Sequence, residues 1–272
     1  MMIVGLVSNS RREETRIIAK EIASVIRSQG LEVLEDWKEG DRLPDLLVVL
    51  GGDGTILGTA RRCGHLNIPL LTINLGRVGF LAELEVNELD EYLERLIKGE
   101  YRRERRMMLQ IMVTRNGERL FRSDALNEVS IMREGIGRMI RLKVLVDSES
   151  LAEYIADGLI CSTPTGSTAY SLSAGGPVVM ADTQAMILTP VCPYTPALKP
   201  LVLDAGKTVR VIADSDQIIL TADGQDTIML STGDQVEIRR SPHSIDLIKL
   251  KEHSIFEVLN KKLYLTEAPP KR

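Results

Sequence analysis

The segment that most constrains the fold is Leu46–Leu50, followed directly by the glycine-rich turn Gly51-Gly52-Asp53-Gly54-Thr55. Five consecutive branched apolar residues predict a strand that is buried on both faces, as in a parallel sheet covered by helices. The glycines let the backbone turn sharply and bring its N–H groups close to a ligand. Because these N–H groups and the positive end of the following helix favour an anion, the turn predicts a phosphate-binding site.

Asp53 places a carboxylate in the middle of this turn. A negative charge there repels phosphate unless a metal ion lies between the two, or unless the carboxylate removes a proton from an attacking hydroxyl. Both roles indicate phosphoryl transfer, and a purely structural alternative is that Asp53 caps the helix. The turn is not a Walker A loop, because no lysine follows its last glycine. It is not a dinucleotide fingerprint either, because three residues rather than two separate Gly54 from Gly58.

Length, charge and composition exclude several classes of protein. The chain has 272 residues and a formal net charge of −4, which allows one large domain or two small ones and argues against a nucleic-acid partner. No apolar run reaches 18 residues and the first residues lack a basic region, so we expect a cytoplasmic protein that does not contact the membrane. Cys63, Cys161 and Cys192 are far apart, and a disulfide framework is not expected.

The spacing of apolar residues divides the chain into two domains and a tail. Strands and helices alternate over residues 1–99, which predicts an α/β N-terminal domain with a parallel sheet that carries the glycine turn. Residues 100–248 contain many short alternating runs and the hairpin signal Asn116-Gly117, which predict a mostly β domain of the stacked-sheet or sandwich type. Residues 249–272 are expected to form a tail that returns to the first domain. The basic run 101–106 is expected to be a solvated crossover, with phosphate contact as the alternative.

Two segments of the β-rich half have the chemistry of a ligand site. Asn127 and Glu128 can hold the two hydroxyls of a ribose, since a carboxylate accepts hydrogen bonds and an amide both accepts and donates. An ordinary surface pair at the start of a strand is the alternative. The long loop after Cys161 is rich in hydroxyls and glycines and contains Tyr170, a composition that is typical of a pocket for a flat base.

Taken together, these motifs resemble the NAD kinase family. The resemblance is carried by Gly51–Thr55, Asn127-Glu128 and Thr165–Ser171, in this order. Two further matches are Asn74–Leu81 and Asp223-Gly224-Gln225. The resemblance extends from the first strand to about Leu250. The glycine turn alone is shared with lipid kinases and, in variant form, with phosphofructokinases, whereas the full set is specific.

The resemblance implies a two-domain phosphotransferase that phosphorylates the adenosine ribose 2′-hydroxyl of NAD to give NADP, with Asp53 as the catalytic base. We expect the site to lie between the domains, with Mg²⁺ neutralising the donor phosphates. No metal ligand is assigned. The phosphate-donor loop would be Gly51, Gly52, Gly54 and Thr55. The family's NAD contacts fall on Gly54, Phe80, Asn127, Glu128, Arg138, Asp157, Thr168, Ala169, Tyr170, Ser171, Leu172, Ser173 and Gln225.

Several alternatives stay open at this point. ATP and inorganic polyphosphate present the same oxygens to a glycine turn, and NADH is an alternative acceptor. A lipid kinase would need an apolar slot, which the hydroxyl-rich loop does not offer, and a noncatalytic dinucleotide sensor would have little use for Asp53. The chain departs from the family pattern at Ile155, where relatives often have a basic residue, and at Tyr194, where histidine is common. The resemblance also implies a homo-oligomer, a dimer or a tetramer.

Overall fold

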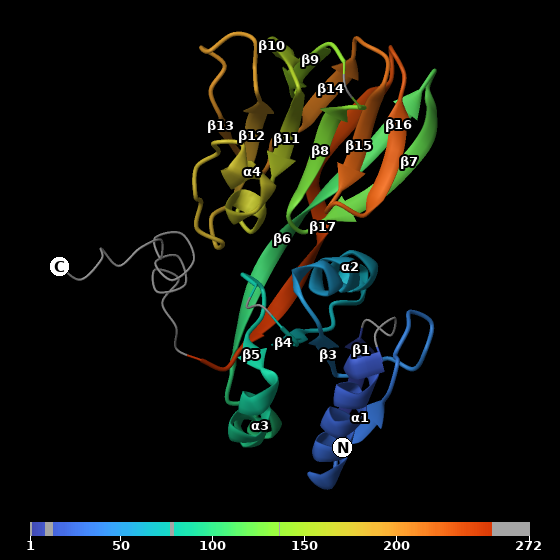
Figure 1. The fold of residues 1–272 in the computed structure, drawn as a ribbon, viewed down its shortest axis with the longest axis vertical. Helices are drawn as coiled ribbons and strands as arrows, with labels where there is room; N and C mark the ends of the chain where they lie inside the picture. Colours follow the sequence, from blue (N-terminus) through green and yellow to red (C-terminus); the bar gives the residue numbers. More distant parts are fainter. Residues whose placement is uncertain (1, 9–12, 77–78, 136, 252–272) are drawn as a thin grey trace, which may run out of the picture.

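The computed structural model describes residues 2–8, 13–76, 79–135 and 137–251. The chain forms an α/β domain and a β-rich domain, which are joined by two long strands that run diagonally through the molecule (Figure 1). None of the helices in the described residues is both long and apolar enough to cross a membrane.

The N-terminal domain is built around a parallel sheet in the order β4-β3-β1-β2. All residues of β3 and β4 are buried, as the unbroken apolar run of residues 46–50 predicts, because helices cover both faces of the sheet. The elements of this domain are β1 (Ile3–Ser8), α1 (Glu13–Ser28), β2 (Glu32–Leu34), β3 (Leu46–Leu50), α2 (Asp53–Cys63), η1 (Gly64–Leu66), β4 (Leu70–Asn74), β5 (Leu84–Glu85), η2 (Val86–Glu88) and α3 (Leu89–Lys98). The predicted parallel α/β domain is confirmed.

The C-terminal part is mostly β, as predicted. Within the described residues, a second sheet in the order β13-β12-β11-β8-β15-β16 packs on β9, β14 and the upper halves of β6 and β17. Its elements are β6 (Arg102–Arg115), β7 (Glu118–Ala125), β8 (Glu128–Arg133), β9 (Ile140–Val146), β10 (Glu149–Ala156), β11 (Gly158–Ser162), η3 (Gly166–Thr168), α4 (Tyr170–Ser173), β12 (Ala185–Val191), β13 (Leu201–Asp204), β14 (Val209–Ala213), β15 (Ile218–Ala222), β16 (Asp226–Leu230) and β17 (Gln235–Lys249).

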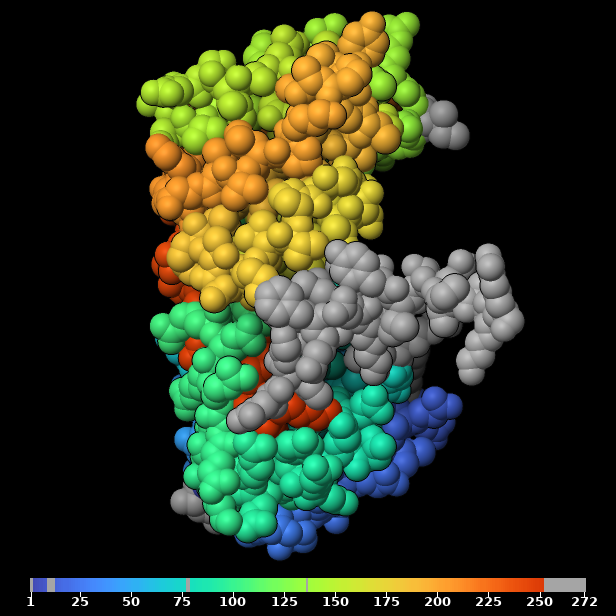
Figure 2. Space-filling model, turned by 90° about the vertical axis from the view of Figure 1, so that its left-hand side faces the viewer, coloured from blue at the N-terminus to red at the C-terminus, as the bar shows by residue number. Residues whose placement is uncertain are grey.

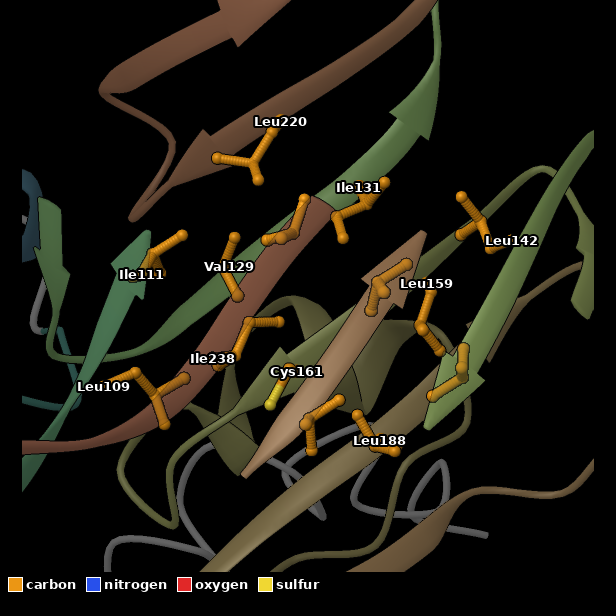
Figure 3. Close-up of a cluster of buried hydrophobic side chains, with 14 of the residues drawn as sticks. Leu109, Ile111, Val129, Ile131, Leu142, Leu159, Cys161, Leu188, Leu220 and Ile238 are labelled. Atoms are coloured by element: carbon orange, nitrogen blue, oxygen red, sulfur yellow. The ribbon is translucent and has the colours of Figure 1, made fainter. Parts of the chain in front are cut away.

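The core of the β-rich part lies between these two sheets. Figure 3 shows side chains from both sheets, such as Leu109 and Ile238 from one and Val129 and Cys161 from the other, pointing into the same apolar layer. Burial raises the pKa of the Cys161 thiol to about 12. This cysteine is therefore a packing residue rather than a nucleophile.

Strands β6 and β17 connect the two parts into one sheet. They pair in antiparallel register from Gln235↔Thr114 to Lys249↔Arg102, and β17 also pairs with β4 in parallel at Leu247↔Leu70. In Figure 2 the red end of the chain lies among the teal atoms of the N-terminal domain. The basic run expected to be a solvated crossover forms the first part of β6, which crosses between the domains, and Arg102, Arg103 and Arg105 are exposed. Arg106 departs from the expectation because it is buried.

Two local predictions can be followed in the structure. Asn116 and Gly117 have φ values of 51° and 85°, as the tight turn of a two-residue hairpin requires, and they connect β6 to β7. At the start of the tail, the backbone N–H groups of Leu250 and Lys251 both donate to Glu83 of the N-terminal domain, each at 2.8 Å. The predicted tail beyond Lys251 lies outside the described residues.

Candidate active site

Asp53 lies at the first position of α2, where strand β3 ends. Its carboxylate accepts hydrogen bonds from the backbone N–H groups of Phe80 (3.0 Å) and Leu81 (3.3 Å), which belong to the loop after β4. The N-cap residue of α2 is Gly52, and no side chain caps the helix. The alternative in which Asp53 caps its own helix is therefore wrong, because the carboxylate bonds to a neighbouring loop.

The absence of a side chain at Gly79 and at Gly51 leaves room for the side chains of Asp53 and Thr55. A Cβ on Gly79 would lie 1.9 Å from Oδ1 of Asp53, and a Cβ on Gly51 would lie 2.5 Å from Oγ1 of Thr55. Neither distance is compatible with a side chain. Within the turn, Gly52 and Gly54 are exposed and Thr55 is half-buried, so the backbone of the predicted donor loop faces solvent where a phosphate would approach.

Asn127 and Glu128 are both buried, at 8% and 9% exposure, so they are not the surface pair that the alternative described. Among the described residues, Oδ1 of Asn127 and Oε2 of Glu128 have no hydrogen-bond partner. Burial, with a smaller contribution from the negative charge of Asp223, raises the pKa of Glu128 to about 7, and a hydrogen bond from the backbone of Tyr170 lowers it. Buried acceptors without partners are a feature of sites that receive a hydrogen-bonding ligand.

The hydroxyl-rich loop packs closely against this pair. Thr163 donates from Oγ1 to the carbonyl of Leu126 at 2.6 Å, and a Cβ on Gly166 would lie 2.2 Å from the carbonyl oxygen of Asn127. The six residues predicted to contact NAD in this loop differ in exposure. Thr168, Ala169 and Leu172 are half-buried, Tyr170 and Ser173 are exposed, and Ser171 is fully buried. The Ser171 hydroxyl bonds to Thr189 at 2.8 Å, so Ser171 anchors the loop.

A narrow pocket brings Phe80 and Thr168 together. It is also lined by Leu81, Arg106, Thr165 and the segment 178–181. Arg106 is buried and bonds Thr165 at 3.3 Å and Glu104 at 2.7 Å, while its Nε has no partner among the described residues. Burial lowers the pKa of its guanidinium. Sequence reasoning did not single out Arg106 within the basic run. Successive side chains of a strand point to opposite faces, and this alternation could have shown which residues of the run point inward.

Gln225 joins the glycine turn from the other domain. Its Nε2 donates to the carbonyl of Gly54 at 2.8 Å. Arg138 and Asp157 do not join this group. Asp157 pairs with Arg133 at 2.7 Å. Arg133 is the last residue of β8 and Glu128 is the first, so five residue steps, or about 17 Å of strand, separate the two. Arg138 is exposed in the loop that follows β8.

The two departures from the family pattern lie next to each other. The backbone N–H of Tyr194 donates to the carbonyl of Ile155 at 2.8 Å. Ile155 is half-buried and Tyr194 is exposed, at the end of the β-rich domain where Asp157 lies. Both changes therefore affect the same surface and leave the surroundings of Asp53 unchanged.

Two family models match this chain, one in each domain. Residues 37–101 match the sequence model of the ATP-NAD kinase N-terminal domain, and residues 126–250 match that of the ATP-NAD kinase C-terminal domain. The NAD kinase of Syntrophotalea carbinolica is 39% identical over 282 residues, which cover 97% of this chain and 98% of that protein. The chain belongs to the NAD kinase family.

Other members of the family agree in sequence and in structure. The NAD kinase of Moorella thermoacetica is 39% identical, with 97% of this chain and 89% of that protein covered. The crystal structure of yeast NADH kinase complexed with NADH has a TM-score of 0.90 at 25% identity, and covers 100% of this chain and 90% of that one. The structure of an NAD kinase from Archaeoglobus fulgidus in complex with ATP has a TM-score of 0.77 at 27% identity. The match covers 97% of this chain and 99% of that one. This NAD kinase family member is therefore a phosphotransferase that phosphorylates NAD to NADP.

Proposed function

We propose that this chain transfers the terminal phosphoryl group of ATP to the adenosine ribose 2′-hydroxyl of NAD, in a site between the two domains, with Asp53 as the general base. The observation that carries the proposal is the seating of the Asp53 carboxylate at the end of β3, between the Phe80–Leu81 loop and the turn that Gln225 contacts. In this position an acid from the phosphate-binding turn lies beside residues of both domains.

Asp53 has the capacity for this role. An ionised carboxylate offers about four acceptor positions, and the two backbone bonds use two of them. The remaining positions can accept the hydrogen of a ribose hydroxyl. The two amides fix the orientation of the carboxylate, so little reorganisation is needed when the proton moves from the hydroxyl to Asp53. Proton removal of this kind contributes about 10²- to 10⁴-fold to the rate.

The residues present fit a magnesium ion that is held mainly by substrate phosphates. No group of three or more His, Cys, Asp or Glu side chains in the described part of the chain forms a metal cluster. Mg²⁺ in kinase sites is usually bound largely by phosphate oxygens and water, so the donor phosphates at the turn 51–55 would supply most of its ligands. When bound, the ion would neutralise charge on the transferred phosphoryl group.

The acceptor pocket favours NAD over a lipid alcohol. The buried pair Asn127 and Glu128 offers hydrogen-bond acceptors without partners among the described residues, which suits the hydroxyls of a ribose. These contacts support a dinucleotide as the acceptor.

The experiment that tests the proposal is a product assay with the purified protein. NAD is incubated with ATP and Mg²⁺, and NADP is measured with an NADP-specific dehydrogenase. We expect NADP with ATP, and no product when a chelator removes Mg²⁺. Parallel reactions with inorganic polyphosphate and with NADH define the range of donors and acceptors. Absence of NADP or NADPH with every donor would refute the proposed function and leave a dinucleotide sensor.

We also propose that the chain acts as a homo-oligomer. Arg138 and Asp157 correspond to family NAD contacts, yet Asp157 pairs with Arg133, about 17 Å along β8 from Glu128, and Arg138 lies in the loop beyond that end. One chain therefore does not bring all of the expected contacts to a single site. A second copy that places its Arg138 and Asp157 near the first site would complete it. Light scattering is expected to give a dimer or tetramer, and a monomer with full activity would contradict this.

The titration of Glu128 is expected to make NAD binding depend on pH. Its pKa of about 7 means that the carboxyl is largely neutral at pH 6. The ionised form accepts stronger hydrogen bonds from both hydroxyls of a diol than the neutral form does, so the affinity for NAD should rise, by up to about tenfold, between about pH 6 and 8. Calorimetry across this range measures it, and Glu128→Gln should abolish the dependence. A flat profile in the unchanged protein would contradict the role of Glu128.

The same titration affects stability in the opposite direction. The pKa of Glu128 is raised from 4.5 to about 7 in the folded state, so folding favours the protonated form. This contribution to stability is complete below 4.5 and is lost as the pH rises through about 7. Bound NAD, which favours the ionised form, should therefore stabilise the protein more at pH 8 than at pH 6.

A further inference from the structure

The turn between β15 and β16, residues 223–226, contacts both halves of the proposed site. Asp223 is buried, and its carboxylate accepts hydrogen bonds from three consecutive backbone N–H groups, those of Leu126 (2.9 Å), Asn127 (2.8 Å) and Glu128 (3.2 Å). These three residues lead from β7 into β8 and carry the pair of side chains that faces the ligand.

No other group could easily replace Asp223 in this contact. Buried N–H groups that lose their acceptor destabilise a structure, because their desolvation is no longer compensated by a hydrogen bond. A carboxylate is suited to satisfy all three, because it combines several acceptor positions with a negative charge. Asp223 therefore fixes the N–H side of the main chain at 126–128, whose carbonyls of Leu126 and Asn127 are bound by Thr163, and with it the direction of the Asn127 and Glu128 side chains.

The same turn bonds to the helix that begins with Asp53. Arg61 of α2 donates to Gln225 at 2.9 Å and pairs with Asp226 at 2.9 Å, and its Nη1 lies 3.7 Å from the Asp223 carboxylate. Gln225 in turn donates to the carbonyl of Gly54 at 2.8 Å. A Cβ on Gly58 would lie only 2.9 Å from Gln225, so α2 approaches the turn closely. Figure 1 shows α2 directly below β7, β16 and β17.

We propose that Asp223 is a positioning residue of the reaction, which holds the Asn127–Glu128 pair in register with Asp53. It does so through hydrogen bonds to the backbone of residues 126–128 and through a longer ion pair, of 3.7 Å, with Arg61 of α2. This rests on the proposed function, in which that pair binds NAD and Asp53 accepts the hydroxyl proton. Asp223 itself is buried and acts through the backbone of residues 126–128 and through Arg61.

Asp223→Asn tests the proposal, and Asp234→Asn is its matched control. Asp234 is also buried in the β-rich domain, where it accepts hydrogen bonds from Arg115 and from the backbone of Ser231. Within the described part of the chain it makes no hydrogen bond or ion pair to a residue of the site. An asparagine at 223 keeps one acceptor but turns an NH₂ group toward backbone donors. We expect the KM for NAD to rise at least tenfold in Asp223→Asn with a smaller change in kcat. Asp234→Asn should lose comparable thermal stability while its KM stays within twofold.

Two further measurements separate positioning from general destabilisation. Removing the negative charge of Asp223 should lower the pKa of Glu128, so the pH dependence of NAD affinity should move to lower pH in Asp223→Asn but not in Asp234→Asn. In an Asn127→Ala and Glu128→Gln background, the effect of Asp223→Asn on KM should shrink to less than threefold, because the residues through which it acts are gone. Additive effects, or equal KM values in the two aspartate variants, would overturn the proposal.

The test remains decisive if the first variant does not fold or if the proposed function fails. Asp223→Ser retains one acceptor in a smaller side chain, and the same shift in KM is expected. Amide hydrogen exchange at residues 126–128 reports the contact without any assay of activity, and protection there should fall while β11 stays protected. If the unchanged protein makes no NADP, the proposed function fails alone, and exchange together with NAD binding then decides the role of Asp223.

Discussion

Asp53→Asn is expected to lower the turnover number for NADP formation by about 10²- to 10⁴-fold while NAD still binds with nearly unchanged affinity. The amide cannot accept the hydroxyl proton, but it occupies the same space. Calorimetry for NAD and steady-state kinetics with ATP measure the two effects separately. A turnover number within threefold of the unchanged protein would remove Asp53 from the role of base.

This variant also disturbs a structural contact, so it needs a control. The carboxylate accepts N–H bonds from Phe80 and Leu81, and an asparagine can accept only one of them, with an expected loss of about 1 to 3 kcal/mol in stability. Asp45→Asn is matched, because Asp45 of the same domain accepts a backbone N–H bond from Ile3 at 2.8 Å. We expect Asp45→Asn to change thermal stability and leave the turnover number unchanged.

Gly79→Ala is expected to reduce the turnover number by about 10²-fold without changing any catalytic group, because a displacement of the order of 1 Å has this effect. The added Cβ would lie 1.9 Å from Oδ1 and 2.4 Å from Cγ of Asp53, so the carboxylate must move. The charge and the acceptor remain, and only their position changes. Turnover and NAD affinity, measured as for Asp53→Asn, check this result.

Gly76→Ala is the control for Gly79→Ala. Gly76 belongs to the same loop, and a Cβ there would contact no non-neighbouring atom of the described residues within 4 Å. Its activity should therefore be close to that of the unchanged protein. If both alanine variants lose activity equally, the loop rather than the Asp53 carboxylate would be responsible, and the close contact between Gly79 and Asp53 would have no catalytic meaning.

The local parts of the site could be predicted from the sequence because each has a short-range cause. Five branched apolar residues before the glycine turn predicted the buried strand β3, which spans these five residues, and the turn predicted a following helix, which begins at Asp53. The pair Asn116-Gly117 predicted a hairpin, since few other residues adopt positive φ at both positions. Hydrogen-bonding chemistry left a ligand role and a surface location open for the Asn127–Glu128 pair; its burial excludes the surface location, and the ligand role stays a prediction.

The contacts of Arg106 and Asp223 could not be predicted from the sequence. Arg106 belongs to a basic run, and charge runs usually face solvent, so the prediction of a crossover followed the general rule. Its burial depends on β17, which pairs with it from more than 130 positions away in the chain. The motif around Asp223 could be recognised, but nothing near it in the sequence indicates that its carboxylate binds the backbone of residues 126–128.

The sequence alone determined the identity of the chemical groups and the class of each segment, because strand periodicity, glycine turns and hydrogen-bonding capacity are local properties. Only the tertiary structure decided which groups meet. It turned the Asp53 carboxylate toward Phe80 and Leu81, joined Gln225 to Gly54, and placed Arg138 and Asp157 at the far end of β8. The physical reason is that these contacts come from long-range strand pairing and side-chain packing, which depend on residues distant in the chain.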